Sequence, residues 1–275
     1  EPWVRGRTPT SDTIGRTVDF AYTSAGRLDT ITYAGRTIRY AYAAGGSGDL
    51  ISVTTPATAD FPSGSTTAYA YDAQHNLTRI TDAKGQAYLT TTYDASDRVA
   101  SQTYGSGTTT IVYSISSGNP VATVTDRNGY KTTYTFDAAG HITKMAQTIT
   151  GGTATTTYTY NAGGERLTDV LPRNNRLHYT YDAKGNTTQV RRKRIGSVAN
   201  DPTDLVTTFT YEPQFNFLKS VTDPRGNVTT YTYDYELGEA ARGNLRRITY
   251  PTVGGVTPQA VFLYNSAGQM TQATD

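Results

Sequence analysis

Residues 179–190 read Tyr-Thr-Tyr-Asp-Ala-Lys-Gly-Asn-Thr-Thr-Gln-Val. The aromatic residues Tyr179 and Tyr181 alternate with polar residues, which is the period-two pattern of a half-buried β-strand. Asp182 suits the first position of a type I turn, because its carboxylate accepts hydrogen bonds from the backbone N–H groups that follow. Gly185 suits the fourth position, where a positive φ is free of a Cβ clash. The stretch therefore predicts a strand, a tight turn with a glycine bulge, and a second strand.

The same turn recurs along the chain, and this is the most specific feature of the sequence. A first set of predicted turns follows an aromatic residue and contains Asp72, Asp94, Asp137 with Gly140, Asp182 with Gly185, and Asp234. An offset set follows a threonine and contains Asp82 with Gly85, Asp126 with Gly129, and Asp223 with Gly226. Two strands of about seven residues and two turns of about four give a repeat of roughly 22 residues.

Aromatic residues occur in pairs two positions apart, so both members of a pair lie on one face of a strand. Stacked in register, the pairs are predicted to form an aromatic band in which each cross-strand contact contributes about 0.2–1 kcal/mol. The residues of this band are Tyr69, Tyr71, Tyr134, Phe136, Tyr158, Tyr160, Tyr179, Tyr181, Phe209, Tyr211, Tyr231 and Tyr233. The alternative is a stacking platform for sugars. Since every repeat carries the pair and a binding site is usually local, the structural interpretation is favoured.

The pattern Tyr-Asp-x-x-Gly, followed by Arg or Asn and then Leu or Thr, resembles the YD repeat of Rhs proteins and of the related toxin-complex and teneurin proteins. The resemblance covers nearly the whole chain in about ten repeats. In that family the repeats form a long β-sheet that spirals into a hollow shell, and the shell commonly encloses a toxic C-terminal domain. The resemblance implies an all-β fold of consecutive antiparallel hairpins in a long curved or spiralling sheet. It also implies a non-catalytic segment of a secreted or cell-surface protein, whose shell encapsulates or displays a toxin or effector domain.

Residues 1–17 are expected to be a divergent lead-in, in which Trp3 caps or plugs a sheet end. The repeat array is predicted to run over residues 18–275 without a domain boundary. Extra residues near 43–67, 148–155, 195–204 and 237–244 are predicted to be surface loops, because a sheet register tolerates insertions only outside its strands. The chain is expected to be a piece of a longer protein.

The composition argues against an ordinary packed core. Only 36% of the residues are hydrophobic, and 22 of the 275 residues are Tyr, which suits a sheet with an aromatic face. The net charge of +2 gives no case for a nucleic-acid or membrane-surface partner. The absence of Cys excludes disulfides and thiolate metal sites. The sequence contains no transmembrane run and no signal peptide.

No group of residues points to an enzyme, a cofactor or a metal. An Asp that every turn requires cannot mark a unique catalytic pair. His75, His141 and His178 lack metal-ligand spacing. Rhs cores usually end in a motif containing Asp-Pro-x-Gly-Leu, near which an Asp-dependent self-cleavage occurs. Here Asn227 follows the Asp-Pro-Arg-Gly turn at 223–226, so no self-cleavage residues are assigned.

Several features leave the partners open. The basic run Arg191–Arg194 could contact an acidic cargo or polyanion, although a charged strand that discourages edge pairing is the simpler interpretation. Asn76, Asn186 and Asn227 match the N-glycosylation pattern, and their places in turns explain them equally well. The expected partners are neighbouring repeats, a toxin cargo and further copies paired through sheet edges. The alternative function is an extended surface fibre or adhesin that binds glycans through its loops or its aromatic face.

Overall fold

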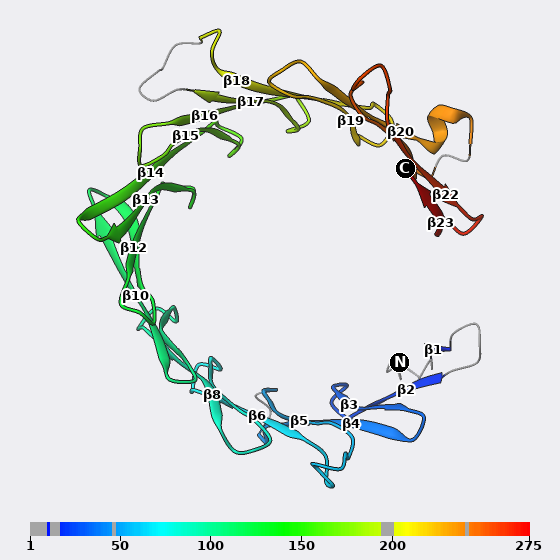
Figure 1. Cartoon of the computed structure of the whole chain (residues 1–275). Helices are drawn as coiled ribbons and strands as arrows, with labels where there is room; N and C mark the ends of the chain where they lie inside the picture. Colours follow the sequence, from blue (N-terminus) through cyan, green and yellow to red (C-terminus); the bar gives the residue numbers. More distant parts are fainter. Residues whose placement is uncertain (1–9, 12–16, 46–47, 194–200, 240–241) are drawn as a thin grey trace, which may run out of the picture. The chain divides into compact units, whose positions relative to one another are not determined.

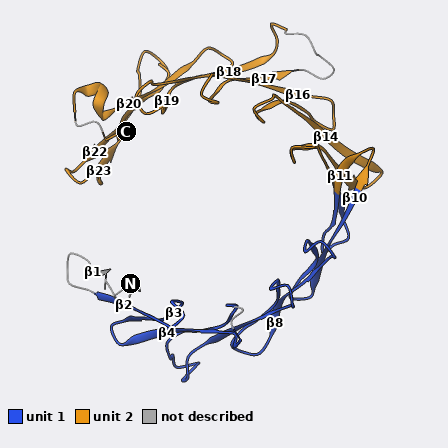
Figure 2. Ribbon diagram, turned by 180° about the vertical axis from the view of Figure 1, so that it is seen from behind, with its two compact units in different colours: residues 1–114, 122–132 blue, residues 115–121, 133–275 orange. Residues whose placement is uncertain are grey.

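The computed structural model describes residues 10–11, 17–45, 48–193, 201–239 and 242–275. The chain divides into two compact units, residues 1–114 with 122–132 and residues 115–121 with 133–275 (Figure 2). The strands that begin in the first unit are β1 (Thr10–Ser11), β2 (Thr17–Tyr22), β3 (Leu28–Tyr33), β4 (Arg36–Tyr42), β5 (Leu50–Thr54), β6 (Thr66–Tyr71), β7 (Leu77–Thr81), β8 (Ala87–Tyr93), β9 (Val99–Tyr104), β10 (Gly107–Ser116) and β12 (Lys131–Phe136). Strand β11 (Asn119–Thr125), like β10 and β12, has residues in both units.

The second unit continues the same architecture. Its strands are β13 (Ile142–Ile149), β14 (Gly152–Tyr160), β15 (Arg166–Val170), β16 (Arg176–Tyr181), β17 (Thr187–Lys193), β18 (Leu205–Tyr211), β19 (Leu218–Thr222), β20 (Val228–Tyr233), β21 (Leu245–Thr249), β22 (Gln259–Tyr264) and β23 (Met270–Thr274). A single turn of 3-10 helix, η1 (Asp234–Leu237), follows β20. Among the described residues it is the one helical element.

Each strand pairs antiparallel with the next strand along the chain. This holds from β1 to β10 in the first unit. It holds again from β13 to β23 in the second unit, as the order of labels along the ribbon shows (Figure 1). The predicted fold class, an all-β array of consecutive antiparallel hairpins that forms part of a β-shell, is confirmed.

Because the strands alternate in direction, the turns alternate between two sheet edges. We call the edge that carries the turns after β2, β4, β6, β8, β12, β14, β16, β18, β20 and β22 the tyrosine rim, since nearly all of these strands end in Tyr. The edge that carries the turns after β3, β5, β7, β9, β11, β13, β15, β17, β19 and β21 is the threonine rim. The two sets of turns found in the sequence lie on these two rims.

The two faces of the sheet differ in chemistry. On one face, the first aromatic residue of a pair lies opposite an aliphatic residue, as Tyr179 does opposite Val190 and Phe209 opposite Val221. On the other face, cross-strand hydroxyls hydrogen-bond, for example Thr180 with an Oγ1–Oγ1 distance of 3.1 Å to its neighbour in β17. Alternating β-branched and aromatic residues favour this arrangement, because successive side chains of a strand point to opposite faces.

The sheet has no thick interior. The buried apolar residues among those described are Val121, Ala122, Tyr233 and Ala260. The chain exposes 17987 Å², about 1.5 times the surface of a compact protein of its mass. Stability must therefore come from contacts between adjacent strands, as in repeat proteins where each repeat contacts only its neighbours.

The hairpins of the tyrosine rim carry a second irregularity that the sequence did not predict. Next to the turn, Tyr181 pairs with Thr187 while the preceding Thr180 pairs with Gln189, so one residue of β17 has no opposite partner. The same shift of one residue occurs beside the final Tyr of β2, β4, β6, β8, β14, β18, β20 and β22. Such bulges increase the local twist of a strand.

One of the predicted insertions is part of a hairpin and not a surface loop. Strands β13 and β14 remain paired as far as Ile149 and Gly152, so residues 148–155 lengthen a hairpin. The threonines of this stretch favour an extended strand over a loop. Residues 43–67 contain β5 between two loops, and residues 237–244 follow η1. The predictions for Trp3 and for residues 195–200 lie outside the described residues.

Candidate functional site

The turns of the two rims are built around a carboxylate or amide side chain. Oδ1 of Asp182 accepts hydrogen bonds from the backbone N–H groups of Lys184, at 2.9 Å, and of Asn186, at 3.0 Å. Gly185 donates its N–H to the carbonyl of Asp182 and has a φ of 84°. The predicted residues Asp72, Asp82, Gly85, Asp94, Asp126, Gly129, Asp137, Gly140, Asp223 and Gly226 occupy the same two positions in their own turns.

The last residue of a turn also bonds to the first. Asn186 donates its side-chain amide to Oδ2 of Asp182 at 2.8 Å. This bond, followed by those from backbone N–H groups, lowers the pKa of Asp182 although burial opposes the shift. In the turn after β14 the roles are reversed, because Asn161 donates and Glu165 accepts at 2.6 Å. In this turn Asn161 stands where other turns have Asp, and Glu165 stands where the turn after β16 has the amide donor Asn186. These two changes, taken together, are the sequence signal for this contact.

Two turns of the tyrosine rim are longer and use deeply buried carboxylates. Glu212 begins a turn that closes one residue later than usual, where its N–H meets the carbonyl of Phe217. Its longer side chain accepts N–H bonds from Gln214, Phe215 and Phe217 at 2.6–3.1 Å. Asp234 begins a turn that closes at Asn244 and is only 2% exposed. The structure thus places Asp234 in a loop with a 3-10 turn, and not in the short turn that the sequence predicted.

The second tyrosine of each aromatic pair links neighbouring hairpins. Tyr181 donates its hydroxyl to the carbonyl of Arg166, the first residue of the strand before it, at 2.7 Å. The same bond, always to the first residue of the preceding strand, is made at 2.7–3.0 Å by Tyr42, Tyr71, Tyr93, Tyr160, Tyr211, Tyr233 and Tyr264. Phe136 occupies the equivalent position without a hydroxyl. Burial raises the pKa of the Tyr181 hydroxyl, so the donor proton is retained at neutral pH.

The twelve residues of the predicted band do not make ring–ring contacts with one another in the part of the chain that the structure describes. Some first members of the pairs lie opposite an aliphatic residue, as Tyr69 does opposite Ile80, whereas Tyr158 lies opposite Asp169. The link between repeats runs from hydroxyl to carbonyl. Tyr179 differs from the other first members of the pairs, because its hydroxyl donates to Asp169 at 3.0 Å. Burial, together with the nearby charge of Asp169, raises the pKa of Tyr179 to about 12.

Replacing Tyr181 with Phe tests one link of this series. We expect the free energy of unfolding to fall by about 1 kcal/mol, because the Arg166 carbonyl loses its donor while the ring is kept. Hydrogen exchange of the β15–β16 amides should become faster, and urea unfolding should report the loss. The matched control is Tyr130→Phe, because Tyr130 is 58% exposed. Equal free energies of unfolding of the two variants would show that the hydroxyl link does not contribute to stability.

A cluster of four aromatic side chains lies between the turn after β18 and the start of η1. Phe215 stacks on Phe217 with ring centroids 5.6 Å apart, and Phe217 lies 5.2 Å from Tyr233. Tyr235 completes the cluster, 5.2 Å from Phe215 and 6.0 Å from Tyr233. Phe215, Phe217 and Tyr235 continue the spacing of two but lie outside the strands, and the sequence analysis did not select them.

The basic run of β17 is engaged inside the protein. Arg191 and Lys193 lie on one face, and both approach the same carboxylate oxygen of Asp204 at 3.3 Å. The side chains of Lys193 and Asp204 are fully buried. His178 and Arg176 of β16 pair with Arg191 and Lys193, so they share this face. Arg194 lies outside the described residues.

His178 makes the stability of the second unit depend on pH. Burial, and then the positive charges of Lys193, Arg176 and Arg191, lower the pKa of His178 below its ordinary value of 6.5, while Asp204 opposes the shift. The unfolded chain therefore takes up this proton first as the pH falls, and the folded state loses stability. We expect the His178→Gln variant to lose less stability than the natural protein between pH 7 and pH 5, measured by urea unfolding. His75→Gln is the control, because His75 is exposed beside Asp49; equal pH dependence of both variants would contradict the prediction.

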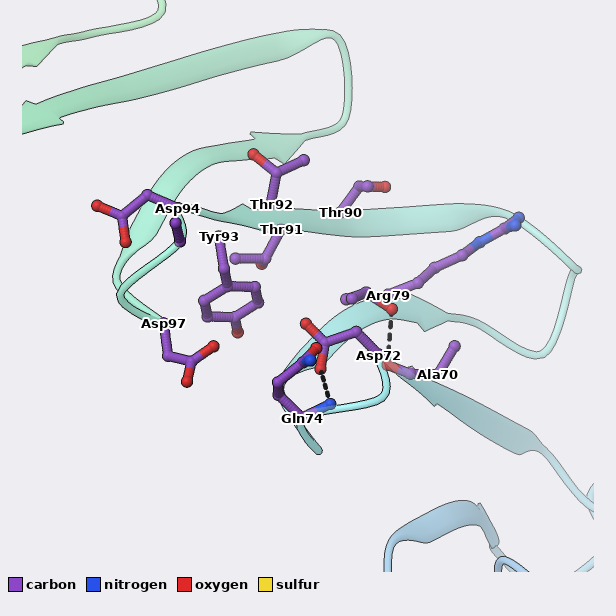
Figure 3. A pocket seen from close by; sticks show the side chains of 12 residues that line it. Ala70, Asp72, Gln74, Arg79, Thr90, Thr91, Thr92, Tyr93, Asp94 and Asp97 are labelled. Atoms are coloured by element: carbon purple, nitrogen blue, oxygen red, sulfur yellow. Dashed lines mark hydrogen bonds between the residues drawn. The ribbon is translucent and has the colours of Figure 1, made fainter.

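A hollow of about 690 Å³ opens at the tyrosine rim of the first unit (Figure 3). Asp72, Asp94 and Asp97 line it, but each carboxylate already has a partner within the turns. Asp72 and Asp97 accept from the side chain of Asn76, and Asp94 accepts from Arg98. Among the described residues, no group of three His, Cys, Asp or Glu side chains is placed to hold a metal ion.

The comparisons with known proteins agree with this geometry. Residues 119–275 match the family model described as Teneurin YD-shell, and residues 46–87 match RHS Repeat. The chain belongs to the YD-shell family. A search of the curated proteins found no match. Within the described residues, no helix has the length and apolar character needed to cross a membrane.

Solved structures share the fold of this YD-shell chain at low sequence identity. The crystal structure of TcdB2-TccC3-Cdc42 superposes with a TM-score of 0.65 at 14% identity, over 95% of this chain and 16% of that one. A Tc holotoxin pore from Photorhabdus luminescens gives a TM-score of 0.64 at 13% identity, over 94% of this chain and 15% of that one. The YD-shell chain therefore spans about a sixth of the solved chains it matches. The family matches point to structural shell repeats and not to a catalytic domain.

Proposed function

We propose that this YD-shell segment is part of a non-catalytic wall that encloses or displays a toxin or effector domain of the same secreted or cell-surface protein. The observation that carries the proposal is the uniformity of the tyrosine links. Eight hydroxyls, each from a different hairpin, bond to the equivalent carbonyl of the preceding strand. Equal links in successive repeats suit a wall, whereas a catalytic site needs one local set of groups.

The setting of the proposal comes from the relatives. The similar solved structures are of TcdB2-TccC3-Cdc42 and of a Tc holotoxin pore, which supports a toxin assembly as the context. Glycan binding by the aromatic face is not favoured, because the second tyrosines use their hydroxyls for links within the sheet. Strand β23 is exposed at all five residues, which supports pairing of this edge with a further repeat or copy.

Limited proteolysis of the full-length polypeptide that carries this array tests the enclosure. We expect a segment outside the array to resist protease while the wall is intact. In the triple variant Tyr181→Phe, Tyr211→Phe, Tyr233→Phe the wall is weakened, and the same segment should be cut faster. The control replaces exposed Tyr104 and Tyr130 with Phe. If every segment outside the array is cut at the same rate in the natural and weakened proteins, the array does not enclose any of these segments.

A further inference from the structure

The turns of the tyrosine rim touch one another in sequence order. In each turn, one residue takes a left-handed backbone conformation, and the residue after it closes the turn. Asn186 closes the turn after β16, and its amide exchanges two hydrogen bonds, at 2.8 and 2.9 Å, with the left-handed residue Asn216 of the next rim turn. Asn216 has a φ of 61°. The contact therefore joins the closing residue of one turn to the left-handed residue of the next.

The same two positions meet in the first unit. The closing residue Asn76 donates its amide to Asp97 at 3.0 Å, and Asp97 has a φ of 57°. The closing residue Asp49 lies 2.9 Å from His75, which has a φ of 68°. Residues other than glycine pay a conformational cost at such angles, so a compensating contact is expected. In all three cases the closing residue is short and polar.

In four contacts of this rim the left-handed residue is glycine and the closing residue before it is large, whereas a Cβ at Gly140 would meet no atom within 4 Å. A Cβ at Gly164 would lie 2.9 Å from Nε2 of His141, and a Cβ at Gly185 would lie 2.9 Å from Oε1 of Glu165. At either position a side chain would fit only if the end of the His141 or Glu165 side chain moved. The large closing residue thus fills the space that a side chain of the next turn would need.

Two further neighbours follow this second arrangement. A Cβ at Gly48 would lie 2.8 Å from the Arg27 guanidinium, and a Cβ at Gly243 would lie 2.7 Å from the Phe217 ring. The last rim turn uses a variant, because Arg242 reaches past its own short closing residue and donates to the carbonyl of Ser266 beside Gly268.

At the threonine rim, a Cβ at Gly107, the first residue of β10, would collide with the Arg127 guanidinium, but three left-handed glycines of that rim have no such neighbour. A Cβ at Gly85, Gly129 or Gly226 would meet no atom within 4 Å. These glycines are explained by backbone conformation alone. The size match at left-handed glycines is therefore a property of one rim, not of the turn itself.

We propose that the tyrosine rim carries a side-chain code that decides which hairpins accept each other as neighbours. A large closing residue requires glycine in the next turn, and a short polar one requires a hydrogen-bonding residue there. The code sets the order and register of the repeats, which a strand face of repeating aromatic and threonine residues specifies only weakly. The inference stands whether or not the wall encloses a cargo.

The code is tested by converting a pair of a large closing residue and glycine into a pair of two hydrogen-bonding residues. Gly164→Asn alone should lower the melting temperature by about 4 °C or more, because the new side chain meets His141. In the His141→Asn background the same change should cost less than about 2 °C, since an amide pair like that of Asn186 and Asn216 can form. Gly85→Asn is the matched control, because it adds the same residue in the same backbone conformation at an open position.

The opposite conversion, of the Asn186–Asn216 pair into a large residue beside glycine, provides an independent test. Asn216→Gly should speed hydrogen exchange in both adjoining turns, and Asn186→His in that background should restore slow exchange. Equal costs of Gly164→Asn in the two backgrounds, matching the cost of Gly85→Asn, would overturn the proposal. If Gly164→Asn prevents folding, the swap at Asn186 and Asn216 decides the question, and failure of the second substitution to restore protection would overturn it.

Discussion

Replacing Asp234 with Ala is expected to lower the free energy of unfolding by about 3 kcal/mol or more. The carboxylate accepts backbone N–H bonds from Tyr235, Arg242, Gly243 and Asn244 at 2.8–3.2 Å. Burial would raise its pKa, but these bonds outweigh that effect and lower it. Removal of the carboxylate leaves several N–H groups without an acceptor in a nearly closed site, and each orphaned group costs about 1–3 kcal/mol.

Urea unfolding and hydrogen exchange of the β20–β21 connection measure this loss. Asp234→Asn should recover part of it, because the amide keeps one acceptor oxygen. The control is Asp126→Ala in a short turn of the threonine rim, where the carboxylate accepts two N–H bonds at an exposed position. A loss at Asp234 no greater than that at Asp126 would contradict the role assigned to the buried carboxylate.

Replacing Lys193 with Met is expected to have an effect of similar size. The Lys193 side chain is fully buried, and its ammonium lies 3.3 Å from Asp204. Breaking a buried ion pair by removing one partner typically costs about 3–5 kcal/mol, because the remaining charge stays desolvated. Thermal and urea unfolding of the Lys193→Met variant measure this cost.

A second variant tests whether the unpaired Asp204 carboxylate causes the loss of stability. The double variant Lys193→Met, Asp204→Leu should recover part of the stability, because the buried carboxylate that lost its ammonium partner is gone, although Arg191 then also loses its contact with Asp204. The single variant should also raise the pKa of His178 toward its ordinary value, since Lys193 is the largest charged contributor to its lowering. An NMR titration of His178 follows this shift. A Lys193→Met protein that is as stable as the natural one would show that the pair contributes nothing.

The turns explain how much of the site could be predicted. Asp and Gly three positions apart specify a local backbone geometry through bonds within five residues, so the turns at Asp82, Asp137 and Asp182 could be predicted from the sequence. The turn at Asp234 could not be predicted in this way, because the 3-10 turn and the later closure at Asn244 depend on packing against β20 and β21. Phe215 and Tyr235 lie outside the strands in turns of two different hairpins, so their contact in one cluster had no local signal.

The sequence by itself determined the all-β class, the hairpin repeat, the two offset sets of turns and the shared face of each aromatic pair. These follow from period-two alternation and from turn chemistry, which act over a few residues. Only the tertiary structure decided that Tyr181 links to Arg166, that His141 fills the space beside Gly164, and that Lys193 pairs with Asp204. These contacts join residues 11–23 positions apart. Their partners depend on which strand lies next in the sheet and on a bulge that shifts the register, and neither is encoded within a single turn.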